Sequence, residues 1–179
     1  MEQVGAAERP CKPPTGDCSV RIRECDRKSD LDGLRRCAIE LQDFERNLDS
    51  RLPEGSSIAD RYIEQMFQDS QRFTGKIFVA EEDGAVVGYA SVWARARAED
   101  IWEAPQEYAL VPELVVLSSH RNRGIGRLLL SASEAYARSH GCQCLRISVL
   151  AANNAARALY TSQGFKDREI LLEMSLTSE

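Results

Sequence analysis

The spacing of apolar residues along the chain separates segments that suit strands from segments that suit helices. Apolar positions alternate with polar ones in residues 19–24, and they recur three or four residues apart in residues 29–44 and 58–73. Residues 76–81 and 85–94 are again strand-like, and Glu82, Asp83 and Gly84 between them are typical of a hairpin turn. The first half is therefore expected to form one strand, two helices joined by a loop at residues 47–57, and a hairpin. Ser29 or Asp30 is the expected cap of the first helix.

Residues 107–117 are apolar at both alternating sets of positions, which is typical of a central strand covered on both faces. Pro112 lies within this strand and has no N–H for a ladder hydrogen bond, so the strand is expected to be interrupted there. A helix should follow from about residue 125 to His140, with Gly141 at its end.

The remaining segments predict a strand at residues 144–150, a short helix at 155–163 and a final strand at 165–176. Asn153 or Asn154 should cap the short helix and Gly164 should end it. In the final strand every second residue from Ile170 is apolar. This order of elements, βααβββαβαβ, indicates the α/β (α+β) class, with a mixed sheet and helices on both of its faces.

Length, composition and charge narrow the class of protein. The 179 residues suit a single domain, with 43% hydrophobic and 28% charged residues. Residues 1–18 carry three prolines and show no periodicity, so we expect a mobile tail followed by one domain at residues 19–179. The net charge of −5 argues against a nucleic acid or an anionic membrane as the partner.

Targeting and metal-binding patterns do not stand out in the sequence. Neither a signal peptide nor a membrane-spanning run is evident, and we expect a cytoplasmic protein. The six cysteines lack CxxC spacing, and His120 and His140 form no metal-binding pattern with them. Free thiols, surface histidines and no metal are therefore expected. An alternative for Cys11 and Cys18 is a disulfide.

The chemistry is concentrated where the central strand passes into the following helix, at residues 121–127 (RNRGIGR). Glycines at 124 and 126 allow the backbone to approach a ligand, and the first N–H groups of the helix are unpaired donors. Together they favour a phosphate-like anion, and Arg121, Arg123 and Arg127 add positive charge. A tight turn closed by glycines explains the same residues equally well.

Two motifs together resemble one family. The first reads Arg121-x-x-Gly124-x-Gly126, and the second begins at Asn153 and runs through Tyr160 to a Gly-Phe pair. In this order, on these predicted elements, they resemble the GNAT superfamily of acetyl-CoA-dependent N-acetyltransferases, over residues 19–176. The resemblance implies a mixed, mostly antiparallel sheet of six to seven strands with a splayed central strand. It also implies acetyl-CoA as the co-substrate and an amine as the acceptor.

The resemblance assigns cofactor-binding roles to particular residues. The backbone of Leu114, Val115 and Val116 is expected to pair with the pantetheine arm, because that arm can add to a sheet edge like an extended peptide. Asn153 should contact acetyl-CoA from the other side of the cleft. The amides expected to hold the pyrophosphate, beginning at the motif arginine Arg121, are those of Asn122, Arg123, Gly124, Ile125, Gly126 and Arg127.

Two residues are candidates for the acid–base chemistry. Glu113 directly precedes the expected pantetheine-pairing residues, and it is our candidate base for the acceptor amine. Its alternatives are an electrostatic anchor for a cationic substrate or a plain strand-end carboxylate. Tyr160 sits where the family places a hydroxyl near the thioester sulfur, so it is our candidate acid for the leaving thiolate. The alternative is a core tyrosine packed with Phe165.

The sequence leaves the acceptor open. In the family, substrate choice comes from regions that correspond here to residues 43–57 and 95–106. The second region holds Glu99, Asp100 and Glu103 around Trp102, which suits a small cationic amine, although a solvated loop is an equal alternative. Other hypotheses are a protein N-terminus or lysine as acceptor, and a non-catalytic acetyl-CoA-binding module. A homodimer is a further hypothesis, but no stretch of sequence fixes an interface.

Overall fold

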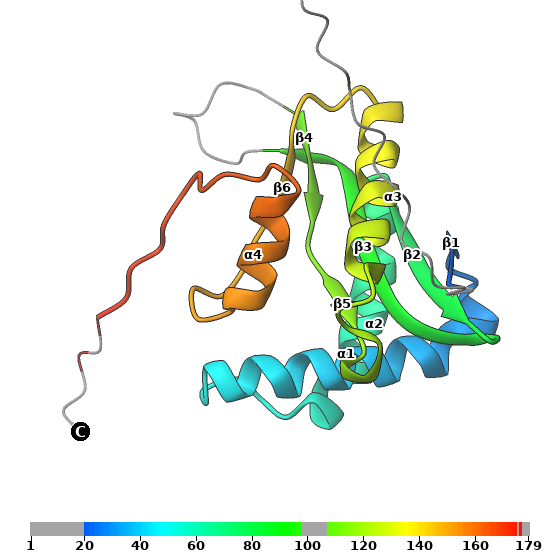
Figure 1. The fold of residues 1–179 in the computed structure, drawn as a ribbon, viewed down its shortest axis with the longest axis horizontal. Coiled ribbons are helices and arrows are strands. Elements are labelled where there is room, and N and C mark those ends of the chain that lie inside the picture. The colour runs from blue at the N-terminus through cyan, green and yellow to red at the C-terminus, as the bar shows by residue number, and fades with distance from the viewer. Residues whose placement is uncertain (1–19, 98–106, 175, 177–179) are drawn as a thin grey trace, which may run out of the picture.

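The computed structural model describes residues 20–97, 107–174 and 176 (Figure 1). The first half contains β1 (Arg21–Glu24), α1 (Arg27–Leu48), α2 (Gly55–Arg72), β2 (Gly75–Glu82) and β3 (Ala85–Arg97). The second half contains β4 (Glu107–Val111), β5 (Leu114–Val116), the 3-10 turn η1 (Ser118–His120), α3 (Ile125–Ser139), β6 (Leu145–Ile147) and α4 (Asn154–Ser162).

The sheet has the order β1-β2-β3-β4-β6, and β5 pairs with β3 beside β4. Every pair is antiparallel except β4 with β6, which run parallel. β4 and β5 are two parts of one strand along β3, broken at Pro112 as predicted. Because β6 pairs with β4 and ends its register at Val111–Ile147, the sheet splays open beyond that point, next to β5.

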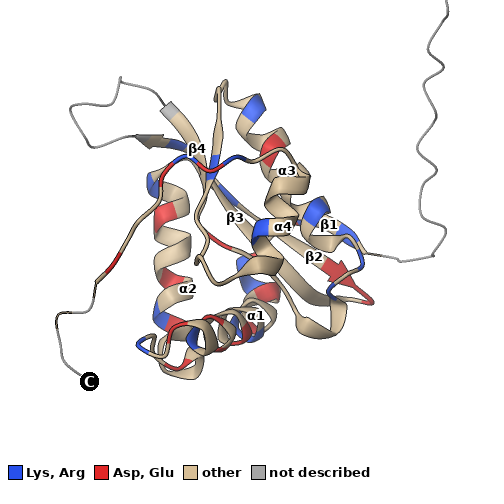
Figure 2. Cartoon of the chain, turned by 60° about the vertical axis from the view of Figure 1, so that its left-hand side comes forward, with Lys and Arg blue, Asp and Glu red and all other residues tan. Residues whose placement is uncertain are grey.

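Helices cover both faces of the sheet (Figures 1 and 2). On one face, Leu34 of α1 and Ile63 of α2 pack against Tyr89 of β3, and all three are buried. On the other face, Leu129 of α3 packs against Ala90 of the same strand. Successive residues of β3 thus face opposite cores, as the pleat of a strand requires. The mixed, mostly antiparallel sheet predicted from the sequence, with helices on both faces, is confirmed.

The starts of the first two helices differ from the prediction. Asp26, and not Ser29 or Asp30, caps α1, since its carboxylate accepts a hydrogen bond from the N–H of Lys28 at 2.8 Å. Asp30 instead pairs with Arg23 of β1 at 2.6 Å, which ties the helix to the sheet. α2 starts three residues early, at Gly55, where a Cβ atom would lie 2.5 Å from the carbonyl oxygen of Ile39. Glycine therefore permits the close approach of the two helices.

The predicted strand at residues 165–176 is wrong. Residues 165–174 have no regular secondary structure, and the apolar side chains that suggested a strand are exposed to solvent. Alternation fits a strand only where another strand pairs with it, and the pattern of one segment cannot supply that partner. β6 is likewise shorter than the predicted 144–150. The expected tail and most of the acidic loop, including Glu99, Asp100, Trp102 and Glu103, lie outside the described residues.

None of the helices in the described ranges is long and apolar enough to cross a lipid bilayer.

Candidate functional site

The loop before α3 forms a concave array of backbone N–H groups. Asn122 and Gly124 both adopt left-handed conformations, with φ of 61° and 81°. Within the described part of the chain, no backbone hydrogen bond starts from the N–H of Asn122, Gly124, Ile125 or Gly126, and the first one of the helix runs from Leu128 to Gly124 at 3.1 Å. Unpaired amides at a helix start, next to left-handed residues, are an anion-binding arrangement.

Two of the three arginines of this loop are engaged by protein groups. Arg121 donates from Nε to the carbonyl oxygen of Val116 at 2.9 Å, and its guanidinium lies 5.0 Å from the ring centre of Phe44. Arg123 pairs with Glu82 at the end of β2. The arginine of the sequence motif is therefore turned inward, where it fastens the loop to β5 and α1. This role could not be read from the motif.

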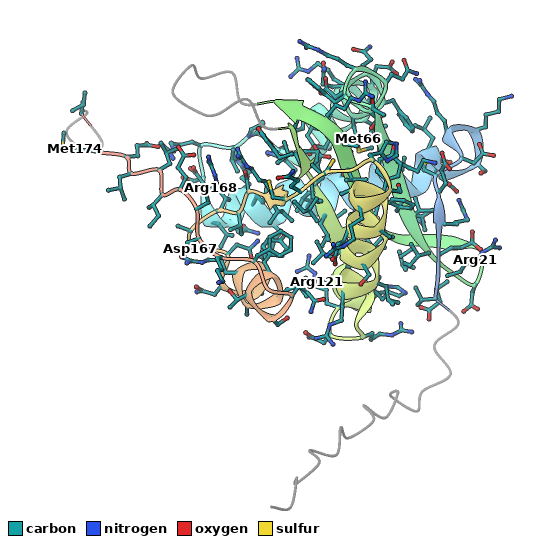
Figure 3. The ribbon with its side chains drawn as sticks, turned by 90° about the horizontal axis from the view of Figure 1, so that it is seen from above. Arg21, Met66, Arg121, Asp167, Arg168 and Met174 are labelled. Carbon is teal, nitrogen blue, oxygen red and sulfur yellow. The ribbon has the colours of Figure 1, made fainter. Side chains whose placement is uncertain are left out.

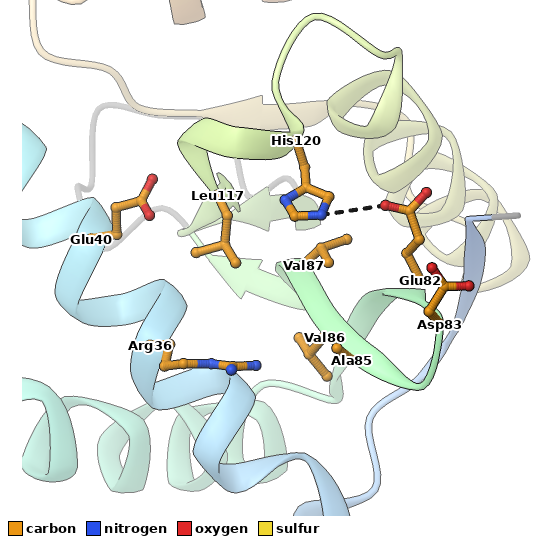
Figure 4. Close-up of a pocket in the computed structure, with 9 residues that line it drawn as sticks. All are labelled: Arg36, Glu40, Glu82, Asp83, Ala85, Val86, Val87, Leu117 and His120. Atoms are coloured by element: carbon orange, nitrogen blue, oxygen red, sulfur yellow. Dashed lines mark ion pairs between the residues drawn. The ribbon is translucent and has the colours of Figure 1, made fainter. Parts of the chain in front are cut away.

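Two carboxylates on other elements, those of Glu40 and Glu82, contact the segment that leads into α3 (Figure 4). Glu40 of α1 accepts a hydrogen bond from the N–H of Ser118 and lies 3.5 Å from Arg121. Glu82 also lies 3.3 Å from Nε2 of His120, which is half-buried and not on the open surface as expected. Glu40 and Glu82 border a pocket of about 440 Å³ between α1, the β2–β3 hairpin and η1. Its lining combines charged side chains with the apolar side chains of Val86, Val87 and Leu117.

The splayed edge of β5 offers backbone groups to a ligand. Ser91 donates to the carbonyl oxygen of Glu113 at 3.1 Å, and Leu117 donates to that of Val87 at 2.9 Å. Because antiparallel pairing alternates along a strand, Val115 also directs its backbone groups towards β3. Leu114 and Val116 direct theirs to the open side, where Arg121 occupies the Val116 carbonyl. Val115 was expected to pair with pantetheine, but the structure turns its backbone groups towards β3 and away from the open side of β5.

Gly126 permits a close approach of α3 to α4 and β5. A Cβ atom on this residue would lie 3.0 Å from Cδ2 of Leu159 on α4 and 3.7 Å from Cδ2 of Leu114 on β5. A side chain here would crowd Leu159 next to the amide array. The amide array suits a pyrophosphate and the open side of β5 suits an extended arm with amide groups, so the described residues suit acetyl-CoA.

Asn153 and Tyr160 are the two candidate site residues at α4, and contacts within the protein fully explain only Asn153. Asn153 is buried and caps the helix, because its side-chain oxygen accepts a hydrogen bond from the N–H of Ala156 at 3.1 Å. This cap alone explains an asparagine at the position. Tyr160 is buried with its ring centre 5.9 Å from that of Phe165, and burial raises the pKa of its hydroxyl to about 12. The hydroxyl therefore remains protonated at neutral pH.

Glu113 joins the two parts of the broken strand and turns its carboxyl group into the layer between the sheet and the first two helices. Burial raises the pKa of this carboxyl group to about 7, and the hydroxyl of Tyr62 opposes part of that increase by hydrogen bonding. Its Oε2 atom is buried without a hydrogen-bond partner. A carboxylate with this pKa exchanges protons near neutral pH, as a general base for an amine must.

Three residues around Glu113 were missed as candidate site residues. Tyr62 of α2 and Tyr89 of β3 lie in segments predicted only as a helix and a strand. Burial raises the pKa of both hydroxyls, and the negative charge of Glu113 raises it further. Tyr89 is fully buried, and its hydroxyl has no hydrogen-bond partner among the described residues. Burial also raises the pKa of Glu45, near the end of α1. Tyrosines on apolar faces were the available signal, since buried hydroxyls normally find a partner.

Comparisons with known proteins give the family. Residues 41–165 match the model of the Acetyltransferase (GNAT) family, and this match spans more than half of the chain. The chain therefore belongs to the GNAT acetyltransferase family.

Individual relatives share less than a third of the aligned residues with this chain. An uncharacterised N-acetyltransferase of Bacillus subtilis, YhfO, is 29% identical over 91 residues, which are 51% of this chain and 58% of that protein. An N-alpha-acetyltransferase of Sulfurisphaera tokodaii is 31% identical over 104 residues, which are 56% of this chain and 62% of that protein. The chain thus spans less than two thirds of the length of these curated relatives.

Solved structures show the same fold. A mutant of the BH1408 protein of Bacillus halodurans superposes with a TM-score of 0.73 at 21% identity, covering 88% of this chain and 99% of that one. The aminoglycoside N-acetyltransferase AAC(6')-Iy in complex with CoA superposes with a TM-score of 0.62 at 19% identity, covering 88% of this chain and all of that one.

Proposed function

We propose that this protein is an N-acetyltransferase that moves an acetyl group from acetyl-CoA directly to a primary amine. The observation that carries this proposal is the combination of two features, the unpaired amides at the start of α3 and the open side of β5. The amides suit the pyrophosphate, and the open side of β5 suits the amide groups of the pantetheine arm. Family membership supports the same assignment.

Glu113 and Tyr160 supply the proton transfers in this proposal. A lysine-like amine has a pKa of ~10.4, so presenting it in the neutral form at pH 7 costs about 4.6 kcal/mol. Glu113 takes the proton as the amine nitrogen forms its bond to the acetyl carbon. Acetyl-CoA supplies an activated acyl group, and its C–S bond breaks as the thiolate leaves. The hydroxyl of Tyr160 then gives a proton to that sulfur.

A small cationic amine is the acceptor class that the described charges favour. Burial raises the pKa of both Glu113 and Glu45, and neither carboxylate forms an ion pair with another described residue. A protonated amine would balance their charge before reaction. The similarity in fold to an aminoglycoside N-acetyltransferase agrees with this class. The relative described as an N-alpha-acetyltransferase favours a protein N-terminus as the second candidate.

The test is release of free thiol from acetyl-CoA in the presence of three acceptor sets: small diamines and polyamines, aminoglycosides, and peptides with free N-termini or lysines. We expect turnover with at least one small polycationic amine. Turnover with peptides alone would favour the second candidate. Binding of acetyl-CoA without thiol release for any acceptor would overturn the proposal in favour of a non-catalytic binding module.

Tyr160→Phe tests the proposed acid. Because the substitution removes only the hydroxyl, acetyl-CoA binding should be unchanged while kcat falls by about 10²-fold, within the range for general acid catalysis. Tyr108→Phe is a matched control on β4. Equal turnover of the Tyr160→Phe variant and the wild type would remove Tyr160 from the mechanism.

A further inference from the structure

Three polar side-chain atoms without hydrogen-bond partners meet on the sheet face that α1 and α2 cover. Tyr89 and Ser91 share that face of β3, because side chains two residues apart in a strand point the same way. Ser91 donates its N–H to the carbonyl oxygen of Glu113 at 3.1 Å, so Glu113 is its cross-strand neighbour and lies diagonally from Tyr89. Oη of Tyr89, Oγ of Ser91 and Oε2 of Glu113 are buried, and none has a partner among the described residues. Buried polar atoms in native proteins nearly always have a partner, so this group needs an explanation.

α2 covers this group and supplies a second tyrosine. The hydroxyl of Tyr62 is hydrogen-bonded to the carboxyl group of Glu113, and its ring packs against the buried cluster that contains Tyr89. Met66, one turn farther along α2, is buried in the same cluster and holds the helix against the sheet (Figure 3). The carboxyl group of Glu113 thus has one tyrosine on the helix side and another on the strand side.

The charged groups that act on Glu113 all disfavour its ionised form. They are Asp69 of α2 and Glu45 of α1, both acidic, and burial acts in the same direction. No ion pair with a basic side chain offsets them within the described ranges. Cys37 of α1 faces Tyr89, but burial raises the pKa of this thiol to about 12, so it adds no charge at neutral pH. Hydroxyl donors are therefore what favours the carboxylate in this layer before an amine binds.

We propose that Tyr62 and Tyr89 are positioning residues for Glu113, and that their hydroxyls hold its ionised carboxylate from two sides. Tyr62 donates to one oxygen, and Tyr89 donates to Oε2 directly or through one buried water molecule. Rotation about the single bonds of the glutamate side chain is enough to bring Oε2 towards the strand-side hydroxyl. Both tyrosines keep their protons, because burial and the charge of Glu113 raise the pKa of each hydroxyl. This inference rests on the proposed role of Glu113 as the base.

Two full-length variants, Tyr62→Phe and Tyr89→Phe, test the proposal, because each removes one hydroxyl and keeps the ring. Tyr136→Phe is the matched control, since its hydroxyl donates to the carbonyl oxygen of Thr74 at 3.1 Å. The pKa of Glu113 is measured by NMR between pH 5 and 9 with ¹³C in the glutamate carboxyl groups, and Glu113→Gln assigns its signal. The ratio of variant to wild-type kcat/KM is measured at pH 7 and pH 9, and circular dichroism checks folding.

Loss of either hydroxyl should raise the pKa of Glu113 by about one, because a hydrogen bond to the charged form favours ionisation roughly tenfold. kcat/KM should then fall about fivefold at pH 7 and return to within about twofold of the wild type at pH 9, where Glu113 is ionised in both. Tyr136→Phe should match the wild type at both pH values.

An unchanged pKa of Glu113 in both variants would overturn the proposal, whether or not acetylation is detected. Equal losses of kcat/KM at pH 7 and pH 9 would also overturn it, since they would show disturbed packing and not a change in the base. If no acceptor is acetylated while the pKa of Glu113 rises in both variants, the proposed function fails and the two tyrosines still hold Glu113.

Discussion

At the scale of single residues, Glu113 links the proposed chemistry to stability. Its pKa lies at about 7 in the folded protein and near 4.5 in an unfolded chain, because burial disfavours the charged form. Between these values the folded state binds more protons, so the free energy of unfolding falls as the pH rises through that window. Glu113→Gln should remove this decline and stabilise the protein at pH 8 by up to about 3 kcal/mol, while abolishing most amine acetylation.

Urea unfolding between pH 4.5 and 8 measures this effect, together with kcat/KM across the same range. Wild-type kcat/KM should rise through pH 7 as Glu113 loses its proton. Glu134→Gln is the control, because Glu134 is an exposed partner of Arg138 on α3. If Glu113→Gln unfolds with the same dependence on pH as the wild type, Glu113 is not the carboxyl group that titrates near neutrality.

The sequence identified several of these residues but not the environments that give them their properties. Glu113 stood out because it precedes the splayed strand, yet its pKa depends on burial by α2 and on Tyr62, which is distant in sequence. The motif placed Arg121 beside an anion, whereas a glutamate on α1 and the Val116 carbonyl turn it inward. Such contacts depend on tertiary structure, which a local motif does not encode.

At the scale of elements, the end of β2 positions the loop before α3. Glu82 has a side chain only 12% exposed and contacts both Arg123 and His120, so its removal frees two points of the loop at once. Glu82→Gln should raise KM for acetyl-CoA by about threefold to tenfold with little change in kcat, because about 1 kcal/mol of ordering is lost before binding.

The measurement is steady-state kinetics in which the concentration of acetyl-CoA is varied. The control is Glu81→Gln, at the adjacent residue of β2. Glu81 pairs with Arg23 of β1 at 2.6 Å, so this variant also breaks an ion pair but leaves the loop untouched. A similar KM for the two variants would show that Glu82 does not position the loop.

Most elements could be predicted because each has a signal within its own residues. The glycine at 141 ends α3 with φ of 76°, and Asn153 caps α4, as the sequence indicated. The break at Pro112 followed from the missing N–H. The irregular structure of residues 165–174 could not be predicted, because their alternation is genuine but a pairing partner is not part of the local pattern. Gly55 was missed as a helix start for the same reason, since only the approach of α1 explains it.

At the scale of the whole molecule, the proposed acetyl-CoA site should make stability depend on that ligand. A ligand at about 100 times its dissociation constant adds about 2.7 kcal/mol to the free energy of unfolding, or roughly 5–10 °C in Tm for a chain of this size. Gly126→Val should remove that gain, because its side chain would clash with Leu159 and displace the helix start whose amides bind the pyrophosphate.

Ser131→Val is the control, because Ser131 is exposed on the same helix. It carries the cost of a β-branched residue in a helix without the crowding at position 126. Thermal unfolding with and without acetyl-CoA should show the full increase in Tm for the wild type and for Ser131→Val, and almost none for Gly126→Val. An undiminished increase in Gly126→Val would place the bound acetyl-CoA away from the start of α3. The amide array at the start of α3 would then need another explanation than the pyrophosphate.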